Sequence, residues 1–221
     1  MITITNSSEN SLKKLNDLVW LDWAKEIQSI AQSGLAYCQD VYDQERYEQL
    51  RDLSIEILNK YTTVDKDIIK LDFANEVGYA TPKVDVRGVV FNKENQILLV
   101  KEKEDAEWAL PGGWGDIGYS PSEVVVKEIQ EEAGIEVEAV KMLAVLDKRK
   151  HNHPPEQHYV YKIFIECKQL SGELGVGIET SDVGFFDLDN LPVLSIQRNT
   201  YEQLNLMFEF NKNPNKNVVF D

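Results

Sequence analysis

The sequence predicts a small all-helical domain followed by a larger domain of the α+β or α/β class. Up to about residue 75, apolar residues recur at steps of three and four, which is the period of an amphipathic helix. After Pro82 they follow the strand period of two. The segment Gly78–Pro82 lies at this change and reads as a linker. We therefore expect a helical domain over residues 1–77 and a mixed domain over residues 78–221.

Three helices are expected in the helical domain. The first runs from about Leu15 to Asp40, the second begins at a cap formed by Asp43, and the third runs from Asp65 to about Asn75. The first two have apolar faces, made by Trp20, Trp23, Ala24, Ile27, Ile30 and Ala31 and by Tyr47, Leu50, Ser54, Ile57, Leu58 and Tyr61. Such faces form either the core of the domain or the surface of a dimer.

Strands and helices alternate in the mixed domain. The strands Val84–Phe91 and Ile97–Lys101 flank the turn Asn92–Gln96, and this spacing predicts a hairpin. The same patterns predict further strands at Val137–Leu146, Tyr159–Cys167 and around Phe185–Phe186, and a helix at Ile196–Phe210.

A short helix between residues 120 and 134 carries the clearest local signals. Ser120 is an N-cap, Pro121 fits the first helical position, and Glu123 completes a capping box with Ser120. Gly134 is placed to end the helix in a left-handed turn. The face that the spacing predicts to be buried consists of Val125, Ile129 and Ala133.

The opposite face of this helix carries Glu128, Glu131 and Glu132. Residues three and four apart share a helix face, so the three carboxylates are expected to converge. Oxygen ligands of this kind suit Mg²⁺ or Mn²⁺. Gly112, in the preceding glycine loop, permits a close backbone approach, so its carbonyl is a further candidate ligand. The alternative is a solvated acidic face in an acidic protein.

These residues resemble the Nudix hydrolase box, G-x5-E-x7-R-E-U-x-E-E-x-G-U, in which U is a bulky aliphatic residue. The matching positions are Gly113, Glu128, Ile129, Glu131, Glu132, Gly134 and Ile135. Two positions depart from the pattern, because Tyr119 stands in place of the first Glu and Lys127 in place of the Arg. Lys127 keeps the positive charge but lacks the bidentate fork of an arginine.

The flanking sequence is similar to one Nudix subgroup, the CDP-choline or ADP-ribose pyrophosphatases with an N-terminal helical domain. The similar segments are Trp20–Gly34, Gly78–Arg87 and Leu110–Trp114. The resemblance implies an α/β/α sandwich with a mixed sheet. It also implies a homodimer in which the helical domain of one subunit overhangs the active site of the other.

Several other residues are candidates for substrate binding. Asp85 and Arg87 share one face of a strand, which is either an exposed sheet face or, as in a Nudix sandwich, part of the nucleotide cleft. Trp108 and Trp114 flank the glycine loop and either stack on a base or cover the core. Glu179 and Asp182 lie in a loop after the last long strand. Nudix enzymes often take a further metal ligand or a base from such a loop.

The segment Lys148–His158 holds all three histidines and the only run of three basic residues. His151 and His153 could chelate a metal, although no cysteine accompanies them. A solvated loop is the second interpretation. The third is a substrate loop in which Lys148, Arg149 or Lys150 meets phosphate.

Composition excludes several classes of function. The net charge is −15, which argues against DNA binding, because a nucleic-acid surface requires a basic stripe. No apolar run approaches the length of a membrane span, and the first residues do not resemble a signal peptide. Cys38 and Cys167 are far apart in sequence and lack metal-type spacing, so a reduced, cytoplasmic protein is expected.

The leading hypothesis is a metal-dependent pyrophosphatase that cleaves a nucleoside diphosphate linked to another moiety, CDP-choline or ADP-ribose by resemblance. In it Glu131 and Glu132 are the principal metal ligands, and Glu128 is a third ligand or orients the attacking water. Tyr119 and Lys127 favour an alternative, a nucleotide sensor on a Nudix scaffold without turnover. A third possibility is RNA 5′-end processing, against which the acidic charge counts.

Overall fold

The computed structural model describes residues 19–221. The chain divides into two compact units. One comprises the described residues up to Thr81 together with Pro155–His158, and the other comprises Pro82–Pro154 and Tyr159–Asp221. Within the described residues, no helix combines the length and the apolar character needed to cross a membrane.

The helical unit contains α2 (Val19–Tyr37), α3 (Val41–Tyr61) and α4 (Lys66–Phe73). The expected start of the first helix, at Leu15, lies outside the described residues. The prediction that Asp43 caps the second helix is wrong. Asp40 is the cap, because its side chain accepts the backbone N–H groups of Tyr42 and Asp43 and satisfies donors that a helix start leaves free.

The core of the helical unit is small. It is formed by Ala24, Ile55, Leu58, Ile69, Phe73 and Ala74. Trp20 packs at its edge and stacks on Tyr61, with 5.0 Å between the ring centroids. Trp23 and Ile30, which were expected on the buried face, are instead 60% and 50% exposed. The buried stripe of α2 is therefore narrower than its apolar residues indicated.

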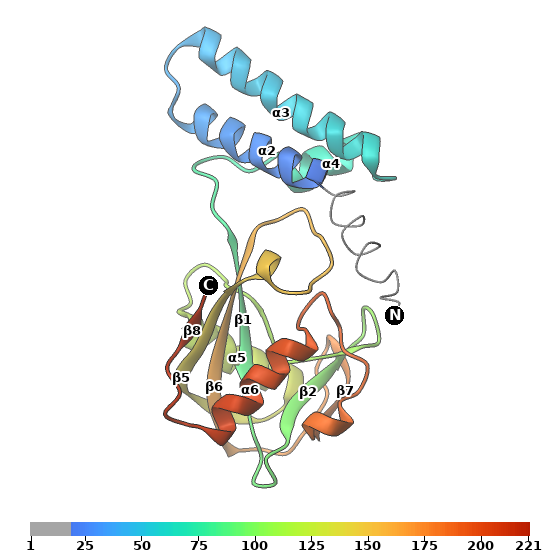
Figure 1. Cartoon of the computed structure of the whole chain (residues 1–221), viewed down its shortest axis with the longest axis vertical. Helices are drawn as coiled ribbons and strands as arrows, with labels where there is room; N and C mark the ends of the chain where they lie inside the picture. Colours follow the sequence, from blue (N-terminus) through green and yellow to red (C-terminus); the bar gives the residue numbers. More distant parts are fainter. Residues whose placement is uncertain (1–18) are drawn as a thin grey trace, which may run out of the picture. The chain divides into compact units, whose positions relative to one another are not determined.

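The second unit contains two sheets (Figure 1). The five-stranded mixed sheet has the order β4-β1-β6-β5-β8, and the three-stranded sheet has the order β3-β2-β7. The strands are β1 (Lys83–Val89), β2 (Ile97–Glu102), β3 (Trp108–Ala109), β4 (Gly112–Trp114), β5 (Glu136–Asp147), β6 (Val160–Ser171), β7 (Thr180–Phe186) and β8 (Val219–Phe220).

The predicted hairpin of β1 and β2 is wrong. Backbone pairing between these segments occurs next to the turn, through a bridge between Phe91 and Ile97 and a hydrogen bond from the Leu98 N–H to the Val90 carbonyl. β1 pairs in parallel with β6 and antiparallel with β4, whereas β2 pairs with β3 and β7. Both edges of β1 are thus taken by strands distant in sequence, which local spacing does not encode.

Two helices cover opposite faces of the mixed sheet, α5 (Pro121–Ala133) and α6 (Tyr201–Lys212) (Figure 1). This arrangement confirms the predicted α/β/α sandwich. α6 begins later than the expected Ile196, because Thr200 and Gln203 form a capping box at its start. The segment before it runs along β3, where the Trp108 N–H donates to the Val193 carbonyl.

The local signals predicted for α5 are all present. Ser120 and Glu123 form the capping box, Pro121 begins the helix, and Gly134 ends it with φ 74°. The predicted buried face is also confirmed, since Val125, Ile129 and Ala133 are inaccessible to solvent. The caps therefore fix both ends of α5, and burial fixes one of its faces.

The C-terminal end of α5 is closed by the loop that precedes β7 and by the first residue of that strand. Gly175 donates its N–H to the Ala133 carbonyl, and the Thr180 hydroxyl donates to the Glu132 carbonyl. These bonds satisfy two acceptors that the helix itself leaves free. A Cβ atom on Gly177 would lie 1.9 Å from the Glu131 carbonyl oxygen, so the loop packs directly on the helix backbone.

Gly177→Ala should therefore destabilise the protein by about 1–3 kcal/mol, because the new methyl group forces the loop off α5. Gly175→Ala is the matched control, since a Cβ atom there meets nothing within 4 Å. Thermal unfolding of both variants measures the difference. Equal stability of the two would contradict the packing described.

Candidate active site

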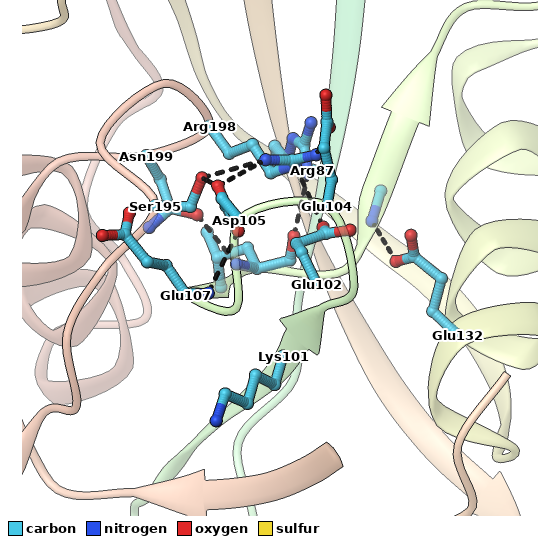
Figure 2. Close-up of polar contacts among 12 residues, drawn as sticks. Arg87, Lys101, Glu102, Glu104, Asp105, Glu107, Glu132, Ser195, Arg198 and Asn199 are labelled. Atoms are coloured by element: carbon cyan, nitrogen blue, oxygen red, sulfur yellow. Dashed lines mark hydrogen bonds and ion pairs between the residues drawn. The ribbon is translucent and has the colours of Figure 1, made fainter. Parts of the chain in front are cut away.

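Glu132 is the most buried carboxylate of the acidic face of α5, with 5% of its surface exposed. Its Oε2 accepts a hydrogen bond of 2.9 Å from the backbone N–H of Gly112 (Figure 2). Burial raises the pKa of this carboxyl to about 8, although the Gly112 N–H and the charge of Arg87 oppose the shift. The site thus holds an acid whose ionised form lacks sufficient countercharge.

Glu128 lies against the glycine loop. Its carboxyl carbon is 3.2 Å from the position that a Cβ atom of Gly113 would take. A side chain at residue 113 would therefore crowd this carboxylate. Burial also raises the pKa of Glu128, while Lys127 lowers it. Two half-buried to buried acids therefore border the same loop.

Glu131 forms an ion pair with Lys127. Lys127 Nζ lies 3.1 Å from the Glu131 carboxylate, 3.4 Å from Glu128 and 3.9 Å from Asp116. Asp116, in the glycine loop, was not singled out from the sequence. Within residues 19–221, no three His, Cys, Asp or Glu side chains are already gathered as a metal site. The acids of α5 are instead divided between Lys127 and the Gly112 N–H.

Arg87 and Asp85 are both buried in β1, so they do not form an exposed sheet face. Asp85 Oδ1 accepts from Arg87 Nε at 2.8 Å, and its second oxygen accepts from Lys162 on β6. Arg87 Nη1 also donates to the Leu110 carbonyl at 3.1 Å. The two cations hold the pKa of Asp85 below its usual value despite burial. Asp85 therefore orients Arg87 beside the glycine loop.

Lys162 was not predicted as a site residue, although its position in the sequence is unusual for a lysine. It is a lysine within the apolar stretch Val160–Ile165 of β6, and it is completely buried. Burial lowers its pKa to about 8, and Asp85 opposes this shift. It thus belongs to the same buried charge group as Asp85 and Arg87.

Two of the three basic candidates of the 148–150 segment, Lys148 and Arg149, differ in position. Lys148 is buried, and its positive charge lowers the pKa of Lys162 and of His153. Arg149 makes two hydrogen bonds to Asp147, of 3.1 and 2.6 Å, and lies 4.5 Å from the Tyr159 ring centroid. Lys148 therefore lies near the buried charges of Asp85, Arg87 and Lys162. Arg149 is instead held by Asp147 and Tyr159.

The three histidines have separate partners. His151 Nε2 lies 3.1 Å from the Asp221 carboxylate, and His153 Nδ1 lies 2.6 Å from the Ile196 carbonyl oxygen. His158 contacts the side chain of Gln157. Burial lowers the pKa of His153 to about 4, so it is neutral at physiological pH. His151 and His153 therefore fix their loop through different neighbours.

The aromatic candidates near the glycine loop also separate. Trp108 packs edge-on against Phe186, with 4.7 Å between centroids, and borders the core that α6 covers. Trp114 is 54% exposed, and Tyr119 is 52% exposed. The position of Trp108 is explained by core packing, whereas Trp114 and Tyr119 present their rings to solvent.

The loop candidates Glu179 and Asp182 are not equivalent. The negative charge of Glu179 raises the pKa of Glu102, so the two carboxylates lie within electrostatic reach. Asp182 accepts the N–H of Val183 and lies on an exposed part of β7. Of the two, Glu179 lies nearer to the buried charges.

A second arginine, Arg198, binds the end of β2. Its Nε lies 3.1 Å from Glu102, and its other nitrogens lie 2.6 Å from Glu104 and 2.9 Å from Asp105 (Figure 2). Next to it, the amide oxygen of Asn199 accepts the Leu110 N–H at 2.8 Å. Neither Glu102 nor Arg198 was recognised from the sequence, because their roles depend on contacts between distant segments.

The donor set suits a divalent cation. Glu128 and Glu132 supply carboxylate oxygens at the edge of a glycine loop, and both have raised pKa values because burial disfavours their charge. A cation removes that penalty by supplying the missing positive charge. Hard ions such as Mg²⁺ or Mn²⁺ prefer these oxygen ligands.

The sandwich, the capped acidic helix and the glycine loop define a hydrolase of the Nudix type, and comparison with known proteins agrees. Residues 81–206 match the NUDIX domain, and residues 19–73 match a domain described as UDP-X-like, N-terminal oligomerisation. The chain belongs to the Nudix family and is a pyrophosphohydrolase.

Several relatives are similar along most of their length. A Bacillus subtilis protein, named provisionally as an ADP-ribose pyrophosphatase, is 52% identical over 91% of this chain and 97% of its own. An ADP-ribose pyrophosphatase of Methanocaldococcus jannaschii is 36% identical over 59% of this chain and 76% of its own.

Two solved structures are also similar. An ADP-ribose pyrophosphatase from Streptococcus suis has 46% identity and a TM-score of 0.58 over 64% of this chain and 100% of its own. A UDP-X diphosphatase has 34% identity and a TM-score of 0.60 over 92% of this chain and 98% of its own. The resemblance to Nudix pyrophosphatases with an N-terminal helical domain, which the sequence predicted, is confirmed.

The raised pKa of Glu132 predicts a pH-dependent stability in metal-free protein. The folded state keeps a proton that the unfolded chain releases, so Glu132 lowers stability as pH rises from about 4.5 to about 8. Glu132→Gln removes this contribution, so its stability relative to wild type should increase over that window. Urea unfolding in EDTA at several pH values measures it, with Glu138→Gln, at an exposed carboxylate, as the control. A constant difference between Glu132→Gln and wild type across the window would contradict the assignment.

Proposed function

We propose that the protein hydrolyses ADP-ribose, or a closely related nucleoside diphosphate derivative, with Mg²⁺ or Mn²⁺. The products are a nucleoside monophosphate and the phosphorylated second moiety. One observation carries the proposal: Glu132 and Glu128 border a glycine loop beside the buried Arg87, in a family of pyrophosphohydrolases. A small nucleotide derivative is thus the proposed partner.

The residues of the chain have distinct proposed roles. Glu128, Glu131 and Glu132 hold the cation, with the carbonyl of Gly112 as a further ligand. A bound cation would neutralise the diphosphate and acidify the attacking water. Arg87, oriented by Asp85, donates to the diphosphate, because a planar guanidinium suits phosphate oxygens. Lys148 adds positive charge in the same region.

The names of the relatives support ADP-ribose as the first candidate. Those in Bacillus subtilis, Methanocaldococcus jannaschii and Streptococcus suis all name this substrate. CDP-choline is the second candidate, from the subgroup that the sequence resembles. The UDP-X diphosphatase adds uridine diphosphate derivatives. A panel of ADP-ribose, CDP-choline and UDP-glucose, assayed for released monophosphate, distinguishes these substrates.

Glu131→Gln and Glu132→Gln test the catalytic assignment on the best substrate of this panel. Each variant removes a charge but keeps the shape, so we expect turnover to fall by about a hundredfold or more. Glu138→Gln, which alters an exposed carboxylate of β5, is the control and should retain activity. Near wild-type rates for both site variants at saturating Mn²⁺ would disprove the metal assignment.

We also propose that the protein is a homodimer formed through its helical unit. That unit matches an oligomerisation domain, and it exposes large apolar side chains, including Trp23 at 60% and Tyr37 at 70%. Aromatic residues are enriched at the centres of interfaces. A dimer would allow the helical unit of one subunit to cover the substrate of the other.

Light scattering should therefore give a mass twice the 25.3 kDa of one chain. Trp23→Ser should shift the equilibrium toward monomer, because it removes an exposed aromatic group expected at the interface. Tyr201→Ser, which removes an exposed aromatic side chain from α6, is the control. A fully active monomer of wild-type protein at micromolar concentration would exclude the dimer.

A further inference from the structure

Glu102 is a buried carboxylate that the proposed reaction does not use. It ends β2 with 5% of its surface exposed. Burial raises its pKa, while the charges of Arg198 and Arg87 lower it. Its negative charge in turn raises the pKa of Glu132. Glu102 therefore lies within electrostatic reach of both the acid and the arginine of the site (Figure 2).

Two arginines thus surround one carboxylate, but only one is its ion-pair partner. Arg198 Nε lies 3.1 Å from Glu102 Oε1. Arg87 directs its Nε to Asp85 at 2.8 Å and its Nη1 to the Leu110 carbonyl. Glu102 is therefore drawn toward Arg198, while Arg87 keeps a different set of acceptors.

Arg198 is held firmly in this position. Besides Glu102, its guanidinium contacts Glu104 at 2.6 Å, Asp105 at 2.9 Å and the Ser195 hydroxyl at 3.0 Å. Its side chain is only 20% exposed. A planar fork with three carboxylates and a hydroxyl has little freedom to move. The arginine is thus a fixed countercharge at the end of β2.

We propose that Arg198 is a positioning residue that retains Glu102 and so keeps this carboxylate off Arg87, leaving Arg87 available for the substrate diphosphate. The inference rests on the proposed function, in which Arg87 contacts that diphosphate. A buried carboxylate that loses its ion-pair partner is left as an uncompensated charge, which favours contact with another cation. In the absence of Arg198, the nearby Arg87 is that cation, and Glu102 then competes with the substrate.

Arg198→Met should therefore raise KM for the best substrate by about tenfold or more, with a smaller effect on kcat. The double variant Glu102→Gln/Arg198→Met should bring KM back near the wild-type value, because the competing carboxylate is gone. Glu102→Gln alone should change KM little. If Arg198 only stabilised the fold, the double variant would be no better than Arg198→Met, and the inference would be overturned.

Two further variants guard against a loss of folding. Arg198→Lys keeps a charge beside Glu102, so its KM should stay much closer to wild type than that of Arg198→Met; equal KM values for the two would contradict the proposal. Lys168→Met removes a cation from an exposed pair with Glu138 in the same unit and should leave KM unchanged. An increase equal to that of Arg198→Met would also overturn it.

A crystal structure of Arg198→Met separates this inference from the proposed function. We expect the Glu102 carboxylate within 4 Å of the Arg87 guanidinium, whether or not the enzyme is active on the chosen substrates. A Glu102 that remains apart from Arg87 refutes the inference. Failure of wild-type protein to hydrolyse any nucleoside diphosphate derivative refutes the proposed function instead.

Discussion

The hydrogen bond from the Gly112 N–H to the Glu132 carboxylate connects the two parts on which the site depends. One part is the buried helix α5, and the other is the glycine loop at β4. Gly112 has φ 142°, and a Cβ atom there would lie 2.1 Å from the Val86 carbonyl oxygen. Only glycine permits this approach. Because Gly112 pairs with Arg87 in the β-ladder, the same contact places the buried acid near the buried arginine.

The distribution of charge explains how an acidic protein can accept an anionic substrate. The chain has a net charge of −15, yet Arg87, Lys148 and Lys162 are all buried, and the first two lie within electrostatic reach of Lys162. The carboxylate of Asp85 neutralises part of this buried positive charge. Local cations determine the field inside a cleft more strongly than the net charge does. The exterior therefore disfavours nucleic acids, while the interior suits a small phosphorylated ligand.

The sequence predicted those features that depend on neighbouring residues. The cap at Ser120 and the left-handed Gly134 follow from contacts within a few positions, and both were found. The pairing of β1 and the contact of Glu102 with Arg198 depend on segments far apart in the chain, and neither was foreseen. Helical period likewise indicated which residues are apolar, but it did not indicate that Trp23 would remain exposed.

The two departures from the Nudix box have different structural consequences. Lys127 still attracts acids, since Glu131, Glu128 and Asp116 all lie within 4 Å of its ammonium group. A lysine does this as a point charge and imposes no bidentate geometry. Tyr119 is half exposed, and its N–H donates to the Asp116 carbonyl. The position of the missing first carboxylate thus lies at the solvent-exposed edge of the loop, whereas Glu132 of α5 is buried. The features that suit a cation depend on Glu128 and Glu132, and these two positions keep the pattern of the family.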